Sequence, residues 1–400
     1  MSDERAIKKV LVVGGGKMGT ALAVLIAQKG IGVVIKKTTK ERAEKAEKDI
    51  DDELSRATQR GRILPDAAGA AKKLITITSD YKNISDVDLV IETTFEDMQT
   101  KRRIFGELDK ILPPDVIFAT NTSALSITEI ASATNRRDKI IGAHFFNPPT
   151  KMLLVELVPG KETSAQTLAT IKRFAEHSLG KISIIVKECP GFLVNRLLMA
   201  YLNEAVLLLS ETKLTVKDMD ETAKKFGWPI GPFALLDYLG IDIAAKIAET
   251  IYAGYGERAK PAPLLEIFVK AGRLGRKTGC GFATNTKGPD GAEQIIDREF
   301  PKRAVLSPRD GFRRMMLCMA NEAWRCVEEK ISSPDDVETG CKYGIGFPDT
   351  FKGPLHWSEK EGLKNIRAEL FALEKKFGIR FTPAKLLAEY AEQDKRLFEE

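Results

Sequence analysis

The sequence predicts an α/β N-terminal region built on a doubly wound parallel sheet, followed by an all-α C-terminal region made of two repeated helical units. The chain has 400 residues, which is more than one compact core accommodates. As far as Glu188, apolar runs alternate with helical patterns, the order typical of a parallel sheet covered by helices. Beyond Glu188 the patterns are helical only, and one stretch repeats. The predicted domains are 1–188, 189–283 and 309–400, with the polar segment 284–308 as a linker.

The elements of the first domain follow from composition and spacing. Apolar, β-branched runs predict strands, and helical spacing predicts helices. The charged segment 40–62, rich in Glu, Lys and Ala, predicts a solvated helical hairpin. The predicted strands are 8–13, 32–35, 74–78, 89–91, 116–120, 139–142, 153–158 and 182–186, and the predicted helices are 20–28, 100–111, 126–133 and 165–179.

A glycine-rich run, Gly14-Gly-Gly16-Lys17-Met18-Gly19, joins the first strand to the first helix, and a second strand follows. This order is the fingerprint of a Rossmann-type dinucleotide-binding domain. Gly14 permits the tight turn, Gly16 lets the backbone approach the pyrophosphate, and Gly19 lets the helix pack closely on the strand. The helix N-terminus supplies amide donors to the phosphates. We therefore expect cofactor contacts from Gly14, Gly16, Lys17, Met18 and Gly19.

Polar residues stand at the ends of apolar runs between 121 and 195, where the fold exposes them to a cleft. Ser123 follows one predicted strand and His144 follows the next. A histidine suits proton transfer because its unperturbed pKa lies near neutral pH. Glu156 comes twelve residues later, after the turn at Asn147-Pro-Pro, and is predicted to return beside His144. A carboxylate there would fix the imidazole tautomer and stabilise the imidazolium.

The same stretch carries a family resemblance. Four motifs in order resemble those of the L-3-hydroxyacyl-CoA dehydrogenases, and the whole run from about Lys8 to the C-terminus is similar to the dehydrogenase part of the bacterial multifunctional fatty-acid oxidation protein. The motifs are Asn121-Thr-Ser123, Gly142-Ala-His144-Phe-Phe-Asn147-Pro, Leu154-Val-Glu156 and Pro190-Gly-Phe-Leu-Val-Asn195-Arg196.

The resemblance implies reversible oxidation of a 3-hydroxyacyl-CoA to the 3-ketoacyl-CoA, with His144 and Glu156 in proton transfer. It implies that Ser123 and Asn195 hydrogen-bond the reacting oxygen and the thioester carbonyl. Against this, His144 could be a packed core imidazole, Ser123 could cap the helix beginning near Ser126, and Asn195 could sit in a helix-start turn.

Other roles also rest on the resemblance. It implies that Glu96, Lys101 and Asn121 lie near the nicotinamide and its ribose, and that Arg56, Arg60 or Arg62 contacts the phosphates of coenzyme A. The alternatives are that Glu96 and Lys101 are surface charges starting a helix, and that the arginines belong to a solvated helix.

The end of the second strand departs from the family. An NAD fingerprint has an acid here to accept from the adenosine ribose, and relatives carry Lys-Asp where this chain has Lys36-Lys37. An ammonium only donates hydrogen bonds. NAD remains the expected cofactor, but Lys37 and Lys40, with Thr38 or Thr39, offer groups for the 2′-phosphate of NADP. Weakened NAD binding, or a Lys37 side chain pointing to solvent, are the alternatives.

The helical repeat is chemically unequal. Asn203-Glu-Ala recurs as Asn321-Glu-Ala, and this alignment places Arg313 opposite Asn195. The second copy therefore lacks the substrate amide, so we expect it to be structural and to stand in for a dimer partner. Fusion relatives carry an enoyl-CoA hydratase unit that nothing here matches, so dehydrogenation alone is expected.

Composition and charge argue against several other classes of protein. The net charge of +6 is spread along the chain without interleaved aromatics, which argues against nucleic-acid binding. The five cysteines lack a disulfide or metal spacing, and the acidic N-terminus does not resemble a targeting segment. We expect a cytoplasmic protein without metal or membrane span, monomeric or homodimeric, that associates with a separate enoyl-CoA hydratase or thiolase. Rival functions are a hydroxy-acid or sugar-acid dehydrogenase without coenzyme A and a non-catalytic acyl-CoA-binding subunit.

Overall fold

The computed structural model describes residues 6–14, 16–82, 84–284 and 291–398. The chain divides into two compact units, Met1–Glu188 and Cys189–Glu400. The division falls where the sequence pattern changes from alternating strands and helices to helices only. Each unit is described by itself.

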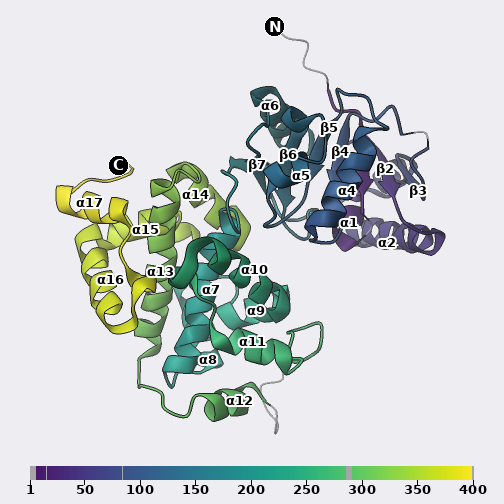
Figure 1. Cartoon of the computed structure of the whole chain (residues 1–400). Helices are drawn as coiled ribbons and strands as arrows, with labels where there is room; N and C mark the ends of the chain where they lie inside the picture. The colour runs from purple at the N-terminus through teal and green to yellow at the C-terminus, as the bar shows by residue number, and fades with distance from the viewer. Residues whose placement is uncertain (1–5, 15, 83, 285–290, 399–400) are drawn as a thin grey trace. The chain divides into compact units, whose positions relative to one another are not determined.

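A single sheet organises the first unit, and within the described residues it has eight strands in the order β3-β2-β1-β4-β5-β6-β7-β8 (Figure 1). All neighbours run parallel except β6 and β7, which are antiparallel. The strands are β1 (Lys9–Val13), β2 (Gly32–Lys36), β3 (Ile75–Thr78), β4 (Leu89–Glu92), β5 (Ile117–Thr120), β6 (Ile140–Phe145), β7 (Leu154–Pro159) and β8 (Ile182–Ile185).

The predicted doubly wound parallel sheet is thus confirmed as a mainly parallel sheet with one antiparallel pair, β6 and β7. The chain between Phe145 and Leu154 is too short for the crossover that a parallel neighbour needs, so β7 returns antiparallel to β6. This connection includes a cis Asn147–Pro148 peptide bond.

Helices cover both faces of the sheet. They are α1 (Lys17–Ala27), α2 (Lys40–Gln59), α3 (Pro65–Lys73), α4 (Met98–Asp109), α5 (Ile127–Ala131) and α6 (Ala165–Arg173), with a 3-10 turn at Arg137–Lys139 and a π-helical turn at Phe174–Ser178. Helix α1 begins at Lys17, three residues before the predicted start, because Gly16 already has the extended backbone of an N-cap. The segment predicted as a hairpin is one helix, α2, and α3 forms the second arm.

The core of this unit forms because side chains alternate across each strand. Val10 and Val12 point to the face covered by α1, α2, α3 and α6, and they pack in one cluster with Leu22 and Ile26 of α1. On the opposite face Phe118 of β5 meets Phe105 of α4 edge to face, with ring centroids 5.3 Å apart. A sheet buried on both faces fits the continuous apolar strands of the sequence.

The second unit is helical, and α7 packs along α13. Its helices are α7 (Val194–Glu211), α8 (Val216–Phe226), α9 (Pro232–Leu239), α10 (Ile241–Tyr255), α11 (Pro263–Lys270), α12 (Ala292–Glu299), α13 (Pro308–Glu328), α14 (Pro334–Gly340), α15 (Pro354–Glu361), α16 (Leu363–Phe377) and α17 (Lys385–Gln393). Short turns are 3-10 at Gly256–Ala259, Asp349–Phe351 and Ile379–Phe381, and π-helical at Cys341–Ile345.

The predicted linker is only partly a linker. Residues 285–290 lie outside the described part, but α12 is an amphipathic helix that buries Ala292, Ile295 and Ile296. Polar composition hid this helix because only these three of its eight residues are apolar, and they lie on one face at helical spacing.

The two helical copies share equivalent hydrogen bonds as well as a repeated sequence. Asn203 donates to the carbonyl of Lys260 and accepts from the amide of Ala262, at 2.9 and 2.8 Å. Asn321 makes the equivalent pair of bonds, to Thr382 and Ala384, at the same two distances. The repeated Asn therefore anchors the chain entering the last helix of each copy.

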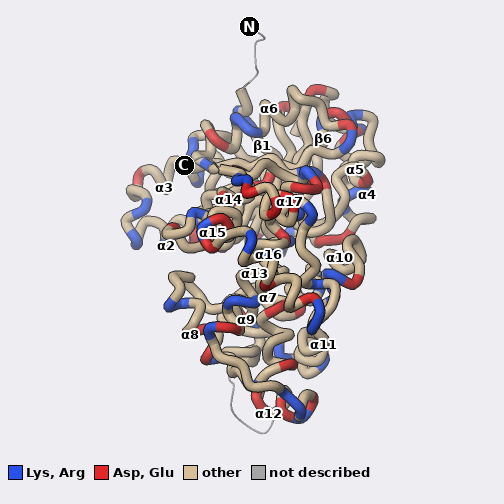
Figure 2. The backbone as a smooth tube through the Cα atoms, turned by 90° about the vertical axis from the view of Figure 1, so that its left-hand side faces the viewer, with Lys and Arg blue, Asp and Glu red and all other residues tan. Residues whose placement is uncertain are grey.

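Charge is mixed over the surface. Figure 2 shows Lys and Arg interspersed with Asp and Glu along the helices of both units. Across the described residues, no helix is both long and apolar enough to cross a membrane.

Candidate active site

The glycine turn lies at the carboxyl end of β1, the edge at which open α/β sheets bind ligands. Gly14 has φ +113°, and a Cβ there would lie 2.7 Å from Thr93. A Cβ on Gly19 would lie 2.6 Å from the carbonyl oxygen of Gly14, whereas one on Gly16 would meet nothing within 4 Å. Gly14 and Gly19 are thus needed for packing, while the backbone at Gly16 faces open space, as a pyrophosphate requires.

A cavity of about 770 Å³ opens at this turn and fits a dinucleotide. Gly14, Gly16 and Lys17 line it, and among the described residues the N-cap of α1 shows no side-chain capping hydrogen bond, which suits amide donors for a phosphate. We call it the cofactor cavity. The side chain of Met18 packs against the core. A cofactor contact from Met18 stays a prediction.

The end of β2 also lines the cofactor cavity. Lys36, Lys37 and Thr38 contribute from the strand end, and Arg42 and Lys45 from α2. The alternative that Lys37 points to solvent is wrong, because the residue is 2% exposed. Burial lowers the pKa of Lys37 to about 8, and Asp49 partly offsets that shift. Thr39 and Lys40 are not among the described residues that line the cofactor cavity. Thr39 instead caps α2 by accepting from the amide of Arg42.

His144 and Glu156 stand directly opposite each other in the antiparallel β6–β7 ladder. Residues opposite in such a ladder share one face of the sheet, so the side chains meet. Nδ1 of His144 lies 2.7 Å from Oε2 of Glu156. Glu156 is fully buried and His144 is 8% exposed. Because an ionised carboxylate only accepts, Nδ1 carries the proton and the lone pair lies on Nε2.

Asn121 and Ser123 occupy the loop after β5. Oδ1 of Asn121 accepts from the amide of Phe145 at 2.8 Å, which ties this loop to the residue after His144. Ser123 does not cap α5, because Ser126 does so by accepting from the amide of Glu129. The helix-cap alternative for Ser123 is therefore wrong.

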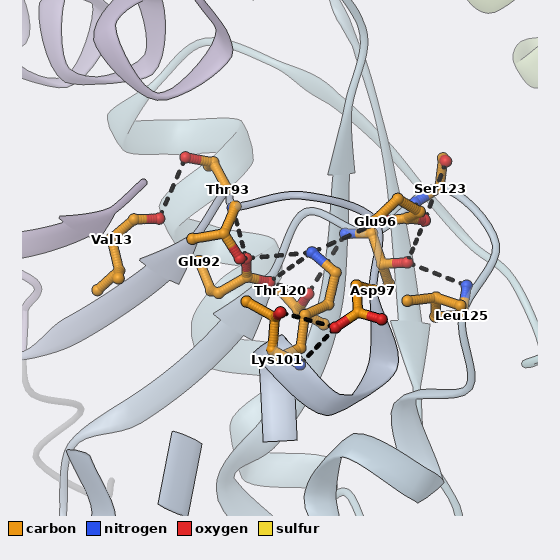
Figure 3. Close-up of polar contacts among 12 residues, drawn as sticks. Val13, Glu92, Thr93, Glu96, Asp97, Lys101, Thr120, Ser123 and Leu125 are labelled. Carbon is orange, nitrogen blue, oxygen red and sulfur yellow. Dashed lines mark hydrogen bonds and ion pairs between the residues drawn. The ribbon is translucent and has the colours of Figure 1, made fainter. Parts of the chain in front are cut away.

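Glu96 holds this loop from the end of β4 (Figure 3). Its Oε1 accepts from the hydroxyl of Thr122 at 2.6 Å, from the amide of Ser123 at 2.8 Å and from the hydroxyl of Ser123 at 3.1 Å. Burial alone would raise the pKa of Glu96, but the nearby Lys101 ammonium and these hydrogen bonds outweigh it, so the pKa lies below its ordinary value.

Lys101 is not a surface charge, since it is 1% exposed. Its Nζ lies 2.8 Å from Oε2 of Glu92 and 3.5 Å from Oε2 of Glu96. The start of α4 is capped by Asp97, which accepts from the amide of Thr100. The alternative that Glu96 and Lys101 merely begin a helix is therefore wrong.

Glu92 is a buried residue that the sequence reasoning missed. It is the last residue of β4, is fully buried, and accepts from Lys101 and, at 2.7 Å, from the hydroxyl of Thr120. An unpaired carboxylate there would be costly, so the lysine neutralises it. The signal was available: an acid closing an apolar strand requires a partner, and Lys101 follows within the next helix.

The remaining predicted contacts lie elsewhere. Arg56, Arg60 and Arg62 are exposed at the C-terminal end of α2, and none of them is among the described lining of the cofactor cavity. Asn195 lies in the first turn of α7, in the second unit. The preceding Gly191 has φ +78°, and a Cβ there would meet Ile251 at 2.8 Å. The approach of Asn195 to substrate stays a prediction.

Arg313, which replaces Asn195 in the second copy, is held by two carboxylates. Its guanidinium donates to Glu369 at 2.8 Å and 3.0 Å and to Glu361 at 2.5 Å, and it lies over the ring of Trp357 at 5.0 Å. These contacts are internal to the second copy and support a structural role.

The strand order, the glycine turn and the cofactor cavity define a Rossmann-type dinucleotide-binding domain, and a helical region follows it. The sequence matches the profile of the 3-hydroxyacyl-CoA dehydrogenase NAD binding domain over residues 9–189. It also matches the profile of the 3-hydroxyacyl-CoA dehydrogenase C-terminal domain over 191–285 and again over 312–396. The chain belongs to the 3-hydroxyacyl-CoA dehydrogenase family, and its first unit contains the family's NAD-binding domain.

Relatives and solved structures agree with this membership. The fatty acid oxidation complex subunit alpha of Shewanella loihica is 37% identical over 99% of this chain and 56% of that protein. The (S)-3-hydroxybutyryl-CoA dehydrogenase of Ralstonia eutropha has a TM-score of 0.68 at 36% identity, covering 70% of this chain and all of that one. The Escherichia coli 3-hydroxybutyryl-CoA dehydrogenase has a TM-score of 0.88 over 97% of this chain and 99% of that chain, and at 24% identity it shows a common fold. The chain spans a little over half the length of the curated relatives it matches.

Proposed function

We propose that the protein interconverts an L-3-hydroxyacyl-CoA and the 3-ketoacyl-CoA, with a nicotinamide dinucleotide as redox partner. The observation that carries this proposal is the His144–Glu156 pair at the carboxyl end of β6, on the same sheet edge as the cofactor cavity. A base held by a buried acid beside a dinucleotide site is the arrangement that alcohol oxidation requires.

The His144 side chain would move the proton. In the oxidising direction Nε2 takes the proton of the 3-hydroxyl, because Nδ1 is already engaged with Glu156 at 2.7 Å. Glu156 then stabilises the charge that develops on the imidazole. Bound NAD would supply the acceptor for the hydride that leaves C3. In the reducing direction His144 returns the proton to the oxygen of the ketone.

Other side chains would position the reactants. Ser123, with its loop held by Glu96, and Asn195 are the proposed hydrogen-bond donors to the reacting oxygen and the thioester carbonyl. Glu96, Lys101 and Asn121 are proposed to face the nicotinamide ribose, and Arg56 and Arg60 to reach the phosphates of coenzyme A. Association with a separate enoyl-CoA hydratase or thiolase is part of the proposal; its support is that the S. loihica relative is named a subunit of a fatty acid oxidation complex.

An absorbance assay tests the proposal. Purified protein is mixed with acetoacetyl-CoA and reduced NAD or reduced NADP, and oxidation of the coenzyme is followed. Turnover that depends on the coenzyme A thioester supports the proposal. Activity with free acetoacetate or a sugar acid, but not with acetoacetyl-CoA, would indicate a dehydrogenase that does not use coenzyme A. Binding of acetoacetyl-CoA without turnover of either coenzyme would indicate a non-catalytic binding subunit.

A further inference from the structure

The adenosine end of the cofactor cavity is strongly cationic. Among the described residues that line the cavity, six are Lys or Arg and two are acids. Four of the cations come from the end of β2 and the first two turns of α2, namely Lys36, Lys37, Arg42 and Lys45. These residues belong to other elements than the glycine turn, which is the expected pyrophosphate site. The excess charge therefore belongs to the position next to the second strand.

That position is where a dinucleotide fold distinguishes its cofactors. A carboxylate following β2 accepts from the ribose 2′-hydroxyl in NAD sites, whereas cationic groups accommodate a 2′-phosphate in NADP sites. In this chain the residue following β2 is Lys37, whose ammonium can only donate. We propose that this cluster binds a 2′-phosphate, so that the protein accepts NADP at least as well as NAD.

The cluster has the geometry of a built site. Arg42 donates to the hydroxyl of Thr38 at 2.9 Å, so the loop after β2 and the first turn of α2 are joined side by side. Lys45 lies one turn further along α2, and the 2% exposed Lys37 lines the same cavity. A planar guanidinium and two ammonium groups in one cavity supply donors for the three oxygens of a phosphate.

The protonation of Lys37 gives independent support. Burial lowers the pKa of this lysine to about 8 despite the nearby Asp49. A dianionic phosphate beside it would stabilise the ammonium and offset that cost. Asp49 also lines the cavity and is the competing feature, because its carboxylate is the alternative acceptor for the hydroxyls of NAD.

Equilibrium calorimetry with adenosine 2′,5′-bisphosphate and with 5′-AMP tests the proposal without relying on turnover. The wild type should bind the bisphosphate at least tenfold more tightly. Arg42→Ala and Lys37→Met should each remove most of that difference; Lys37→Met keeps the apolar stem in its buried site. Lys40→Ala is the matched control: it removes a charge from the same helix start at a residue outside the described lining of the cavity, and it should keep the difference.

The outcomes separate this inference from the proposed function on which it rests. Wild-type protein that binds 5′-AMP as tightly as the bisphosphate would overturn the inference. It would also be overturned if Arg42→Ala, shown to be folded by circular dichroism, kept the tenfold difference between the two ligands. Loss of all mononucleotide binding in Asp49→Asn would show that this carboxylate holds the ribose and would also overturn it. Preferential bisphosphate binding without turnover of acetoacetyl-CoA would sustain the 2′-phosphate site and contradict only the proposed function.

Discussion

At the scale of single residues, three of the polar groups proposed to touch a reactant are held by a carboxylate that is at least partly buried. His144 is held by Glu156, Ser123 by Glu96, and Lys101 by Glu92. Such pairing fixes geometry before a substrate arrives, which is the condition for efficient positioning. The sequence predicted the first pair, because two strand residues separated by a short turn face each other. It missed Glu92, although an acid that closes an apolar strand signals a buried partner, here Lys101.

The Glu96 contacts predict a local effect on the loop after β5. Glu96→Ala removes the acceptor for the amides of Ser123 and Ala124, so their hydrogen exchange should accelerate about tenfold, which corresponds to the loss of one to two hydrogen bonds. Glu162→Ala is the control, because that side chain pairs with Arg137 only on the surface. Unchanged exchange in Glu96→Ala would show that the loop is held by other groups.

The protection of this loop should also depend on pH. The folded pKa of Glu96 lies below its ordinary value, so the native state binds fewer protons than the unfolded chain there. The stabilisation is then complete above the unfolded pKa of about 4.3 and is lost as the pH falls through the lower folded value. Wild-type protection should decline on acidification, and Glu96→Ala should lack this decline. The same decline in both proteins would contradict the assignment.

At the scale of elements, the alternation of apolar runs and the glycine turn predicted most of the first unit. The short connection after Phe145 also predicted that the chain returns beside His144, as the antiparallel β7 does. The helix α12 could not be predicted in the same way, because it has only three buried apolar residues within a polar segment. Tertiary packing of those side chains decides its conformation, which local pattern does not report.

Two glycines in equivalent backbone states should respond in opposite ways to alanine. In Gly19→Ala the new Cβ would lie 2.6 Å from the carbonyl oxygen of Gly14, so α1 must shift; we expect a loss of about 1–3 kcal/mol and weaker NAD binding by calorimetry. Gly69 lies inside α3 with nothing within 4 Å, so Gly69→Ala should stabilise the protein by up to about 1 kcal/mol. Equal effects of the two substitutions on urea unfolding would refute the packing role of Gly19.

At the scale of the molecule, ion pairs join the two helical copies: an arginine of each copy pairs with two glutamates of the other. Arg196 of the first copy lies 2.5 Å from Glu322 and 2.7 Å from Glu329 of the second. Arg314 of the second copy pairs with Glu204 and Glu211 of the first. Since each pair has its counterpart at the repeated position, the interface resembles the self-complementary contact of a two-fold dimer. The repeat was visible in the sequence, but the ion pairs between the two copies were not.

Removing one of these ion pairs should lower the stability of the protein. Glu322→Gln leaves the 1% exposed Arg196 with one carboxylate, so we expect a loss of about 3 kcal/mol. Burial opposes ionisation of Glu322, but Arg196, Arg325 and Arg258 lower its pKa to about 2. This stabilisation is therefore present above the unfolded pKa and is lost as the pH falls towards 2.

Arg313→Ala should also destabilise the protein, by less than Glu322→Gln does, and should leave kcat/KM unchanged. A large fall in kcat/KM would contradict the structural role of the second copy.

The most direct test of the central claim is the turnover of His144→Gln with acetoacetyl-CoA and reduced coenzyme, measured beside coenzyme binding by calorimetry. Glutamine keeps a polar side chain beside Glu156 but cannot transfer the proton. We predict coenzyme affinity within about twofold of wild type and a kcat lower by about two orders of magnitude or more. Near-normal turnover in this folded, coenzyme-binding variant would contradict it.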